Sequence, residues 1–247
     1  KTWAVIKANA YGHGIERAFE GLRAADGFAL LDLAEAERVR HLGWRGPILL
    51  LEGVFEPRDL ELCSRLSLWH AVHCDEQIDM LAAHKTQVPH RVFLKLNSGM
   101  NRLGFTPQRY RTAWARLNAL PQVDEISFMT HFSDADLEQP GHCGIDRQLA
   151  VFHATTQDLP GERSISNSAA TLLHGDENNV RCDWVRPGIV LYGSSPDFPA
   201  HDIAHWGLQP TMTLSSRIIG TQELKAGDSV GYGSKFRAEA PLRLGVV

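Results

Sequence analysis

The chain has 247 residues, of which 43% are apolar and 22% charged, so it can bury one large core or two ordinary ones and is not a disordered chain. Its 25 basic and 29 acidic residues give a formal charge of −4, which is too weak a field to favour nucleic acid. No run approaches the roughly 18 consecutive apolar residues of a membrane helix, and the first residues lack the order of a signal peptide, so we expect a small-molecule partner and no membrane.

Eight short β-rich runs bounded by Gly, Pro, Asp or Asn alternate with segments of helical periodicity. The predicted strands are residues 3–8, 27–33, 47–51, 68–73, 91–96, 125–131, 164–167 and 183–185. Amphipathic stretches lie between them, such as residues 34–42, 75–84, 108–120 and 145–157. Repeated βα units predict an α/β fold with a parallel sheet, and eight of them predict a (β/α)₈ TIM-type barrel over residues 1–206.

The pattern changes after Trp206 to alternating runs with Gly-rich turns, at residues 211–219, 228–232 and 243–247. These runs predict a C-terminal all-β domain. Residues 207–247 are too few for an ordinary domain, so we expect them to be only its beginning. The sequence starts at Lys1 and not at Met, and we expect the N-terminus to be missing or processed.

Four cysteines, Cys63, Cys74, Cys143 and Cys182, are spaced too widely for a paired metal knuckle or a C-x-x-C redox motif. This spacing predicts reduced packing thiols, a cytoplasmic location and no metal site.

Polar residues follow the predicted strands directly, where a barrel of this type places its catalytic groups. They are Lys7, Asp32, Glu52, Lys95, Asn97, His131, Asn167 and Arg186. Desolvation at a barrel mouth would lower the pKa of a lysine such as Lys7 and make its amine a better nucleophile. Position alone fits a solvated strand-end lysine better than a catalytic one, so the pattern supports an enzyme without selecting its chemistry.

Residues 4–14, AVIKANAYGHG, resemble the cofactor-lysine signature of the alanine racemase family. The signature is long and specific, and the resemblance continues in order through the chain. It implies that pyridoxal 5'-phosphate (PLP) is bound covalently by Lys7, and that Tyr11 also contacts this cofactor.

Residues 93–105, FLKLNSGMNRLGF, resemble a second family segment. By that resemblance Arg102 contacts the phenolic oxygen of the cofactor and helps to place the substrate carboxylate, while Lys95 is a position where carbon dioxide often forms a carbamate that orients the arginine. Residues 129–136, MTHFSDAD, resemble the histidine segment, in which His131 is hydrogen-bonded between a tyrosine base and an arginine.

Residues 165–169, ISNSA, are similar to the family segment in which Asn167 contacts the cofactor and the hydroxyl of Ser168 binds its phosphate.

Residues 183–193, DWVRPGIVLYG, carry the most information about mechanism. The resemblance implies that Arg186 faces the pyridine nitrogen and that the N–H groups of Gly188 and Ile189 hold the phosphate. A guanidinium has no acceptor and stays charged, so the ring nitrogen stays unprotonated and the cofactor is a weaker electron sink than it is beside a carboxylate.

Residues 230–233, VGYG, resemble the segment of the second base and place it at Tyr232. Removal of an α-proton from one face and its return to the other is simplest with two bases on opposite sides. The resemblance gives the D-face to Lys7 and the L-face to Tyr232, with Tyr232 reaching in from the second subunit of a homodimer.

Taken together, these segments predict an isomerase that interconverts L- and D-alanine, either for peptidoglycan or for alanine catabolism. A racemase of another amino acid, such as serine or lysine, stays open, because a pocket discriminates one methylene by only about 1–3 kcal/mol. A PLP-carrier protein is opposed by the β-rich residues 208–247, and a PLP-dependent decarboxylase by Arg186, since that class places a carboxylate at the ring nitrogen.

Overall fold

The computed structural model describes residues 1–137 and 144–247, which form two compact units, Lys1–Thr211 and Met212–Val247. Cys143 lies outside the described residues. The three other cysteines, Cys63, Cys74 and Cys182, are free thiols, and Cys63 is buried.

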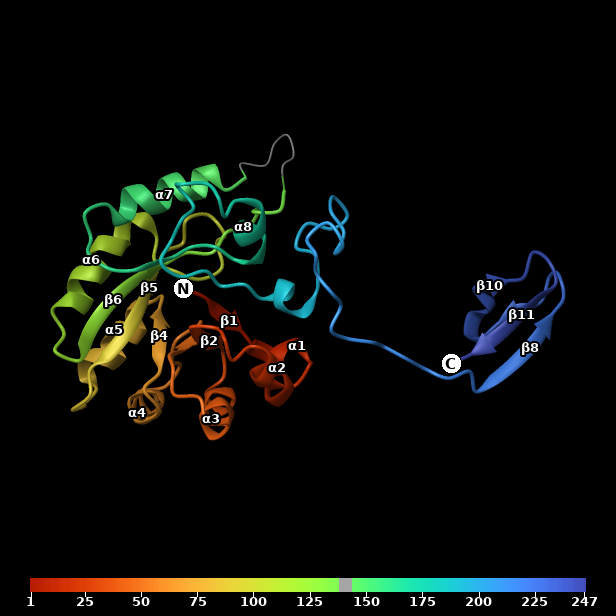
Figure 1. The fold of residues 1–247 in the computed structure, drawn as a ribbon, viewed down its shortest axis with the longest axis horizontal. Helices are drawn as coiled ribbons and strands as arrows, with labels where there is room; N and C mark the ends of the chain where they lie inside the picture. Colours follow the sequence, from red (N-terminus) through yellow and green to blue (C-terminus); the bar gives the residue numbers. More distant parts are fainter. Residues whose placement is uncertain (138–143) are drawn as a thin grey trace. The chain divides into compact units, whose positions relative to one another are not determined.

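Seven strands of the larger unit form one parallel sheet in sequence order, as expected for repeated βα units (Figure 1). They are β1 (Trp3–Val5), β2 (Gly27–Leu30), β3 (Ile48–Leu50), β4 (Trp69–Val72), β5 (His90–Lys95), β6 (Val123–Met129) and β7 (Arg163–Ser164). The α/β class predicted from the sequence is confirmed, and each of these strands overlaps a predicted one.

The helices that connect the strands are α1 (Lys7–Tyr11), α2 (Ile15–Gly21), α3 (Leu33–His41), α4 (Pro57–Leu66), α5 (Asp75–Ala83), α6 (Pro107–Asn118), α7 (Asp146–Thr156) and α8 (Ser168–Leu173). Figure 1 shows α3 to α7 on one side of the curved sheet, each beside its neighbouring strands. The apolar faces of these helices and the outward-facing strand residues make one large hydrophobic core.

The predicted eighth strand at residues 183–185 is wrong as a regular strand, because among the described residues it forms only an isolated bridge between Thr2 and Val185. The segment nevertheless lies between β7 and β1 and, through hydrogen bonds to both, closes the curved sheet into a ring. Trp184 and Arg186 donate backbone hydrogen bonds to the β7 side, at Arg163 and Ser166. Trp3 donates one to the carbonyl of Val185. Pro187 has no N–H to donate, but its carbonyl still accepts a hydrogen bond from the N–H of Val5 at 3.1 Å.

A second, smaller core fills the inside of the ring with residues that alternate along the strands with those of the outer core. The rings of Trp3 and Trp184 stack there with centroids 4.1 Å apart, and Trp69 meets Trp3 edge-on at 5.4 Å. Trp3 and Trp69 begin β1 and β4, and Trp184 lies in the closing segment, so the three side chains close the amino end of the ring. The polar strand ends lie at the opposite mouth.

The smaller unit contains two antiparallel pairs, β8 (Gly220–Leu224) with β11 (Leu242–Val246) and β9 (Ser229–Val230) with β10 (Phe236–Arg237). The predicted runs at residues 228–232 and 243–247 overlap β9 and β11, in agreement with the predicted all-β character. The predicted run at residues 211–219 is wrong as a strand, because β8 begins only at Gly220.

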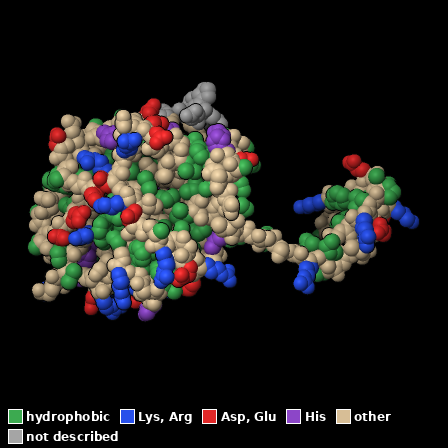
Figure 2. All heavy atoms as spheres, viewed as in Figure 1, with side chains coloured by type: hydrophobic (Ala, Val, Ile, Leu, Met, Phe, Trp, Pro, Cys, Tyr) green, Lys and Arg blue, Asp and Glu red, His purple; other side chains and the backbone are tan. Residues whose placement is uncertain are grey.

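Basic and acidic side chains are interspersed on the face of the larger unit drawn in Figure 2, with no broad area of one sign. Across residues 1–137 and 144–247, no helix has both the length and the apolar character needed to cross a membrane.

Candidate active site

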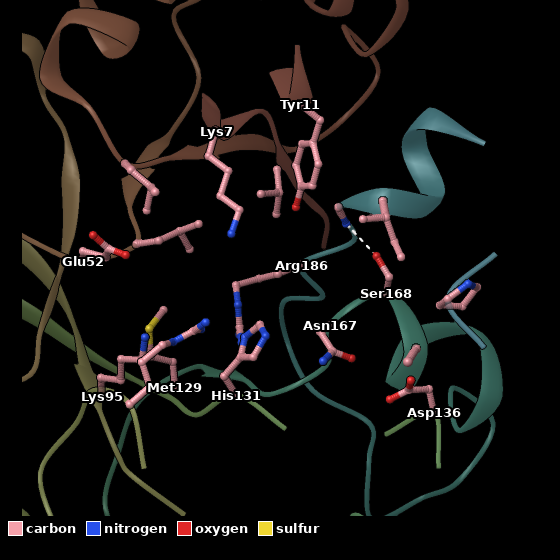
Figure 3. Close-up of a pocket in the computed structure, with 18 residues that line it drawn as sticks. Lys7, Tyr11, Glu52, Lys95, Met129, His131, Asp136, Asn167, Ser168 and Arg186 are labelled. Atoms are coloured by element: carbon pink, nitrogen blue, oxygen red, sulfur yellow. Dashed lines mark hydrogen bonds between the residues drawn. The ribbon is translucent and has the colours of Figure 1, made fainter. Parts of the chain in front are cut away.

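A cavity of about 270 Å³ opens at the carboxyl ends of the strands of the larger unit (Figure 3). Ten of the eleven site residues predicted from the sequence line it: Lys7, Tyr11, Lys95, Arg102, His131, Asn167, Ser168, Arg186, Gly188 and Ile189. They come from segments up to 182 positions apart, which the closed ring brings to one mouth. The eleventh, Tyr232, belongs to the smaller unit, where it is fully exposed.

Lys7 begins a turn with an unusual backbone. The four residues after it, Ala8 to Tyr11, all have φ between 52° and 56°, in the left-handed region. This region costs a residue other than glycine roughly 1–2 kcal/mol. The turn brings Tyr11 back beside Lys7, whose ammonium nitrogen is 5.9 Å from the centre of the tyrosine ring. Figure 3 shows both side chains extending into the same space.

The strained turn is held by Asn9. Its backbone N–H donates to Glu35 Oε1 at 2.6 Å, and its side-chain oxygen accepts bonds from Arg38 and from the N–H of Ile15. These bonds to α2 and α3 fix the turn from outside the cavity. Strain concentrated beside a reactive group and supported by its surroundings is typical of functional sites.

Arg186 lies in the floor of the cavity and is 5% exposed. It donates to Ser164 Oγ at 2.6 Å and to the carbonyl of Thr130 at 2.5 Å. Its third contact, at 3.4 Å, is with Nδ1 of His131. Burial lowers the pKa of Arg186 to about 10, so the guanidinium is still charged at neutral pH.

Burial, followed by the charge of Arg186, lowers the pKa of His131 to about 2. The imidazole is therefore neutral, and its Nδ1 can accept a hydrogen bond from the guanidinium of Arg186. This pairing of a charged donor with a neutral acceptor fixes the tautomer of His131, because Nε2 must then carry the ring proton.

Lys95 ends β5 and is 8% exposed. Burial is the main cause that lowers its pKa to about 8, and the positive charges of Arg186 and Arg102 lower it further. No ion pair to Lys95 occurs in the part of the chain that the structure describes. A substantial fraction of this amine is thus neutral at slightly alkaline pH.

The opposite wall combines Tyr11, Ser168 and Gly188. The N–H of Gly188 donates to Ser168 Oγ at 2.8 Å. A Cβ placed on Gly188 would lie only 2.4 Å from the hydroxyl of Tyr11, so a larger residue at this position would displace the Tyr11 ring. Gly188 precedes the short 3₁₀ helix η1 (Ile189–Tyr192), and Ser168 begins α8. Burial raises the pKa of Tyr11, so its hydroxyl keeps its proton and remains a donor.

Three further polar or loop residues line the cavity, Glu52, Asp136 and Pro196. The sequence marks Glu52 only as one strand-end residue among several. Asp136 is the last residue of the MTHFSDAD segment, so its membership of that motif could have marked it as a site residue. Pro196 lies outside all the family motifs named above. In residues 1–137 and 144–247 no three His, Cys, Asp or Glu side chains are grouped to hold a metal ion.

Comparison with known proteins identifies the family. The sequence profile described as "Alanine racemase, N-terminal domain" matches residues 1–196, and the one described as "Alanine racemase, C-terminal domain" matches residues 211–247. The chain belongs to the alanine racemase family. An alanine racemase of Delftia acidovorans is 79% identical over 247 residues, which are the whole of this chain and 67% of that relative.

Solved structures of the alanine racemase family agree with this assignment. The biosynthetic alanine racemase from Pseudomonas aeruginosa has a TM-score of 0.92 and 42% identity, over 99% of this chain and 67% of that one. A histidine racemase from Leuconostoc mesenteroides subsp. sake NBRC 102480 is also similar, with a TM-score of 0.77 and 27% identity over 99% of this chain and 66% of that one. The fold thus serves racemases of more than one amino acid.

Proposed function

We propose that this member of the alanine racemase family interconverts L- and D-alanine with PLP bound at Lys7. One observation carries the proposal: Lys7 and the nine other lining residues implied by the family motifs meet around a single cavity of about 270 Å³. The match to a Delftia acidovorans relative named alanine racemase, at 79% identity, supports the choice of substrate. The physiological role that we propose is the supply of D-alanine for peptidoglycan, or its catabolism, in the cytoplasm.

The residues of the cavity fit PLP. Four basic side chains, Lys7, Lys95, Arg102 and Arg186, line it against two carboxylates, so the site favours a ligand with several negative charges. Ser168 and the backbone of Gly188 and Ile189 would hold the phosphate, on the wall where Gly188 lies against the hydroxyl of Tyr11. Arg186 would donate to the pyridine nitrogen, and Lys7 supplies the amine for covalent attachment.

When bound, PLP withdraws electrons from the substrate α-carbon and makes the α-proton removable. The chain supplies the proton transfers. We assign Lys7 to one face of the α-carbon and Tyr232 to the other. Arg102 holds the substrate carboxylate. Arg186 cannot take up a proton at neutral pH, so it limits electron withdrawal by the cofactor ring and favours prompt return of the proton over side reactions.

We further propose that the active protein is a homodimer in which Tyr232 of one copy serves the cavity of the other. The support is the resemblance of residues 230–233 to the family segment of the second base, together with the complete exposure of the Tyr232 side chain.

The first test is chemical. Borohydride reduction of the PLP-loaded protein, followed by peptide mapping, should locate the reduced cofactor on Lys7, because this lysine begins the strained turn at the cavity. Lys7→Ala should lose both the covalent label and racemisation. Exposed Lys85 gives the matched control, since Lys85→Ala should keep both. A label on Lys95, or on any other lysine, would show that the assignment is wrong.

A racemase of another amino acid is the second candidate, and the structural similarity to a histidine racemase favours retaining it. A D-amino-acid oxidase assay over L-alanine, L-serine, L-lysine and L-histidine separates the two. We expect kcat/KM for alanine to exceed the others. A higher value for one of the larger substrates would reassign the specificity and leave the Lys7 chemistry unchanged.

A further inference from the structure

A buried carboxylate organises the loop that follows the last motif of the sequence. Asp197 is 5% exposed. Its Oδ1 accepts hydrogen bonds from Ser195 Oγ and Trp206 Nε1, both at 2.9 Å. Its Oδ2 accepts from Nδ1 of His201. One side chain thus collects donors from across a segment of twelve residues, 195–206, which we call the Asp197 loop.

The hydrogen bonds to Asp197 are strong enough to keep its buried carboxyl ionised. Burial by itself raises the pKa of this carboxyl, but the hydrogen bonds that it accepts outweigh burial and hold the pKa below its usual value. Asp197 is therefore ionised at neutral pH, and hydrogen bonds to an ionised group are stronger than those between neutral groups. The rings of His201 and His205 stack with centroids 3.9 Å apart, which adds a further contact within the loop.

The Asp197 loop is joined to the cavity at two points. Pro196, between two residues of the hydrogen-bonded cluster, lines the cavity. Immediately before the loop, the N–H of Ser194 donates to the carbonyl of Ile189 at 3.2 Å. Ile189 also lines the cavity and belongs to the wall that we assign to the phosphate. A carboxylate outside the cavity thus fixes the backbone on either side of a lining residue.

We infer that Asp197 is a positioning residue, which holds Pro196 and η1 in the form that binds the cofactor. The inference rests on the proposed function only for the identity of the ligand, PLP. The effect of Asp197 on the conformation of Pro196 and η1 does not depend on it. Without the carboxylate the loop samples other conformations, and apparent affinity falls by the fraction of molecules in the competent one. If that fraction drops to roughly one tenth, the Kd for PLP rises about tenfold. The chemistry of a filled site stays the same.

The test compares Asp197→Ala with Asp202→Ala, a matched change at an exposed carboxylate of the same loop that accepts a hydrogen bond from the N–H of His205. Hydrogen exchange of the cofactor-free protein over residues 188–196 should speed up in Asp197→Ala and stay at the wild-type rate in Asp202→Ala. Titration with PLP, followed by absorbance, should give a Kd about tenfold higher for Asp197→Ala alone. With the cofactor saturating, kcat and the KM for alanine should remain within about twofold of wild type.

Two further variants make the result decisive even if Asp197→Ala folds poorly. Asp197→Asn keeps an oxygen for Ser195 and Trp206, and should restore most of the PLP affinity. Pro196→Gly leaves the carboxylate in place and should weaken PLP binding severalfold through the wall itself. Unchanged exchange at residues 188–196 in Asp197→Ala, or wild-type PLP affinity in both Asp197→Ala and Pro196→Gly, would overturn the inference. A wild-type protein that binds no PLP would instead refute the proposed function, and the exchange experiment would still decide the role of Asp197 in the wall.

Discussion

At the scale of single residues, burial of several basic groups close together sets the protonation states in the cavity. Lys95, His131 and Arg186 all have a lowered pKa, and in each case burial is the largest cause. The three groups nevertheless differ in charge at neutral pH, because their ordinary pKa values differ. Arg186 stays charged, His131 is neutral, and Lys95 changes protonation near physiological pH. One environment thus produces a fixed cation, a neutral hydrogen-bonding ring and a titrating amine.

The titrating amine gives a prediction about carbon dioxide. A neutral amine attacks carbon dioxide and forms a carbamate with release of a proton, and Arg186 and Arg102 would stabilise the resulting anion. The pKa of Lys95 is lowered to about 8, so at a fixed pressure of carbon dioxide the carbamate should increase as pH rises through that value. Carbon-13 NMR of protein under labelled carbon dioxide measures it.

The matched variants are Lys95→Arg, which should remove the carbamate signal, and Lys85→Arg at an exposed site, which should keep it. A signal that persists in Lys95→Arg would assign the modification to another amine. Absence of any signal between about pH 7 and pH 9 would show that the neutral amine is not accessible to carbon dioxide.

At the scale of elements, the turn after β1 shows where sequence pattern stops being informative. The run at residues 3–8 predicted a strand that continued past Lys7, but β1 ends at Val5 and α1 follows with left-handed dihedral angles. Nothing in Ala8 or Ala10 favours φ above zero. The conformation is imposed by the bonds from Asn9 to Glu35 and Arg38, which are more than 25 positions away in sequence.

This imposed conformation predicts an unusual response to glycine. Ala8 has φ of 54° and is exposed, so Ala8→Gly should relieve strain and stabilise the cofactor-free protein by about 1 kcal/mol. Ala115, exposed in the interior of α6, is the matched control. Ala115→Gly should destabilise by about 1 kcal/mol, because glycine has more freedom to lose in a right-handed helix. The midpoints of urea unfolding measure both changes. A loss of stability in Ala8→Gly equal to that in Ala115→Gly would contradict the imposed strain.

At the scale of the whole molecule, the sequence predicted the α/β class, the order of the strands and a β-rich C-terminal region, placed at residues 207–247, because these depend on periodicity and on turn residues. It also named ten residues that line the cavity, through motifs that follow strand ends. It placed a regular strand at residues 183–185, where the structure has an irregular closing segment with one isolated bridge. It missed Pro196 and the Asp197 loop too, because their arrangement depends on contacts between residues that form no periodic pattern.

The division into two units gives the last prediction, because Lys7 lies in Lys1–Thr211 and Tyr232 in Met212–Val247. A base that acts on one face gives an asymmetric defect. Tyr232→Phe keeps the ring and deletes the ionisable hydroxyl, so exchange of the α-hydrogen of L-alanine with solvent should nearly cease. Exchange from D-alanine, which depends on Lys7, should continue. Proton NMR in heavy water follows both. Equal loss from the two enantiomers would argue against two bases.

Whether the two bases come from different copies is decided by mixing the inactive variants Lys7→Ala and Tyr232→Phe. If Tyr232 serves the partner's cavity, a mixed dimer contains one site with both defects and one site with neither, so activity should return. At equal concentrations and random exchange of subunits, half of the dimers are mixed, and each has one intact site of two. Recovery should therefore approach about one quarter of wild-type activity. Native mass spectrometry verifies that mixed dimers have formed. Mixed dimers without activity would place both bases of each site in the same chain, because every site would then carry one of the two defects.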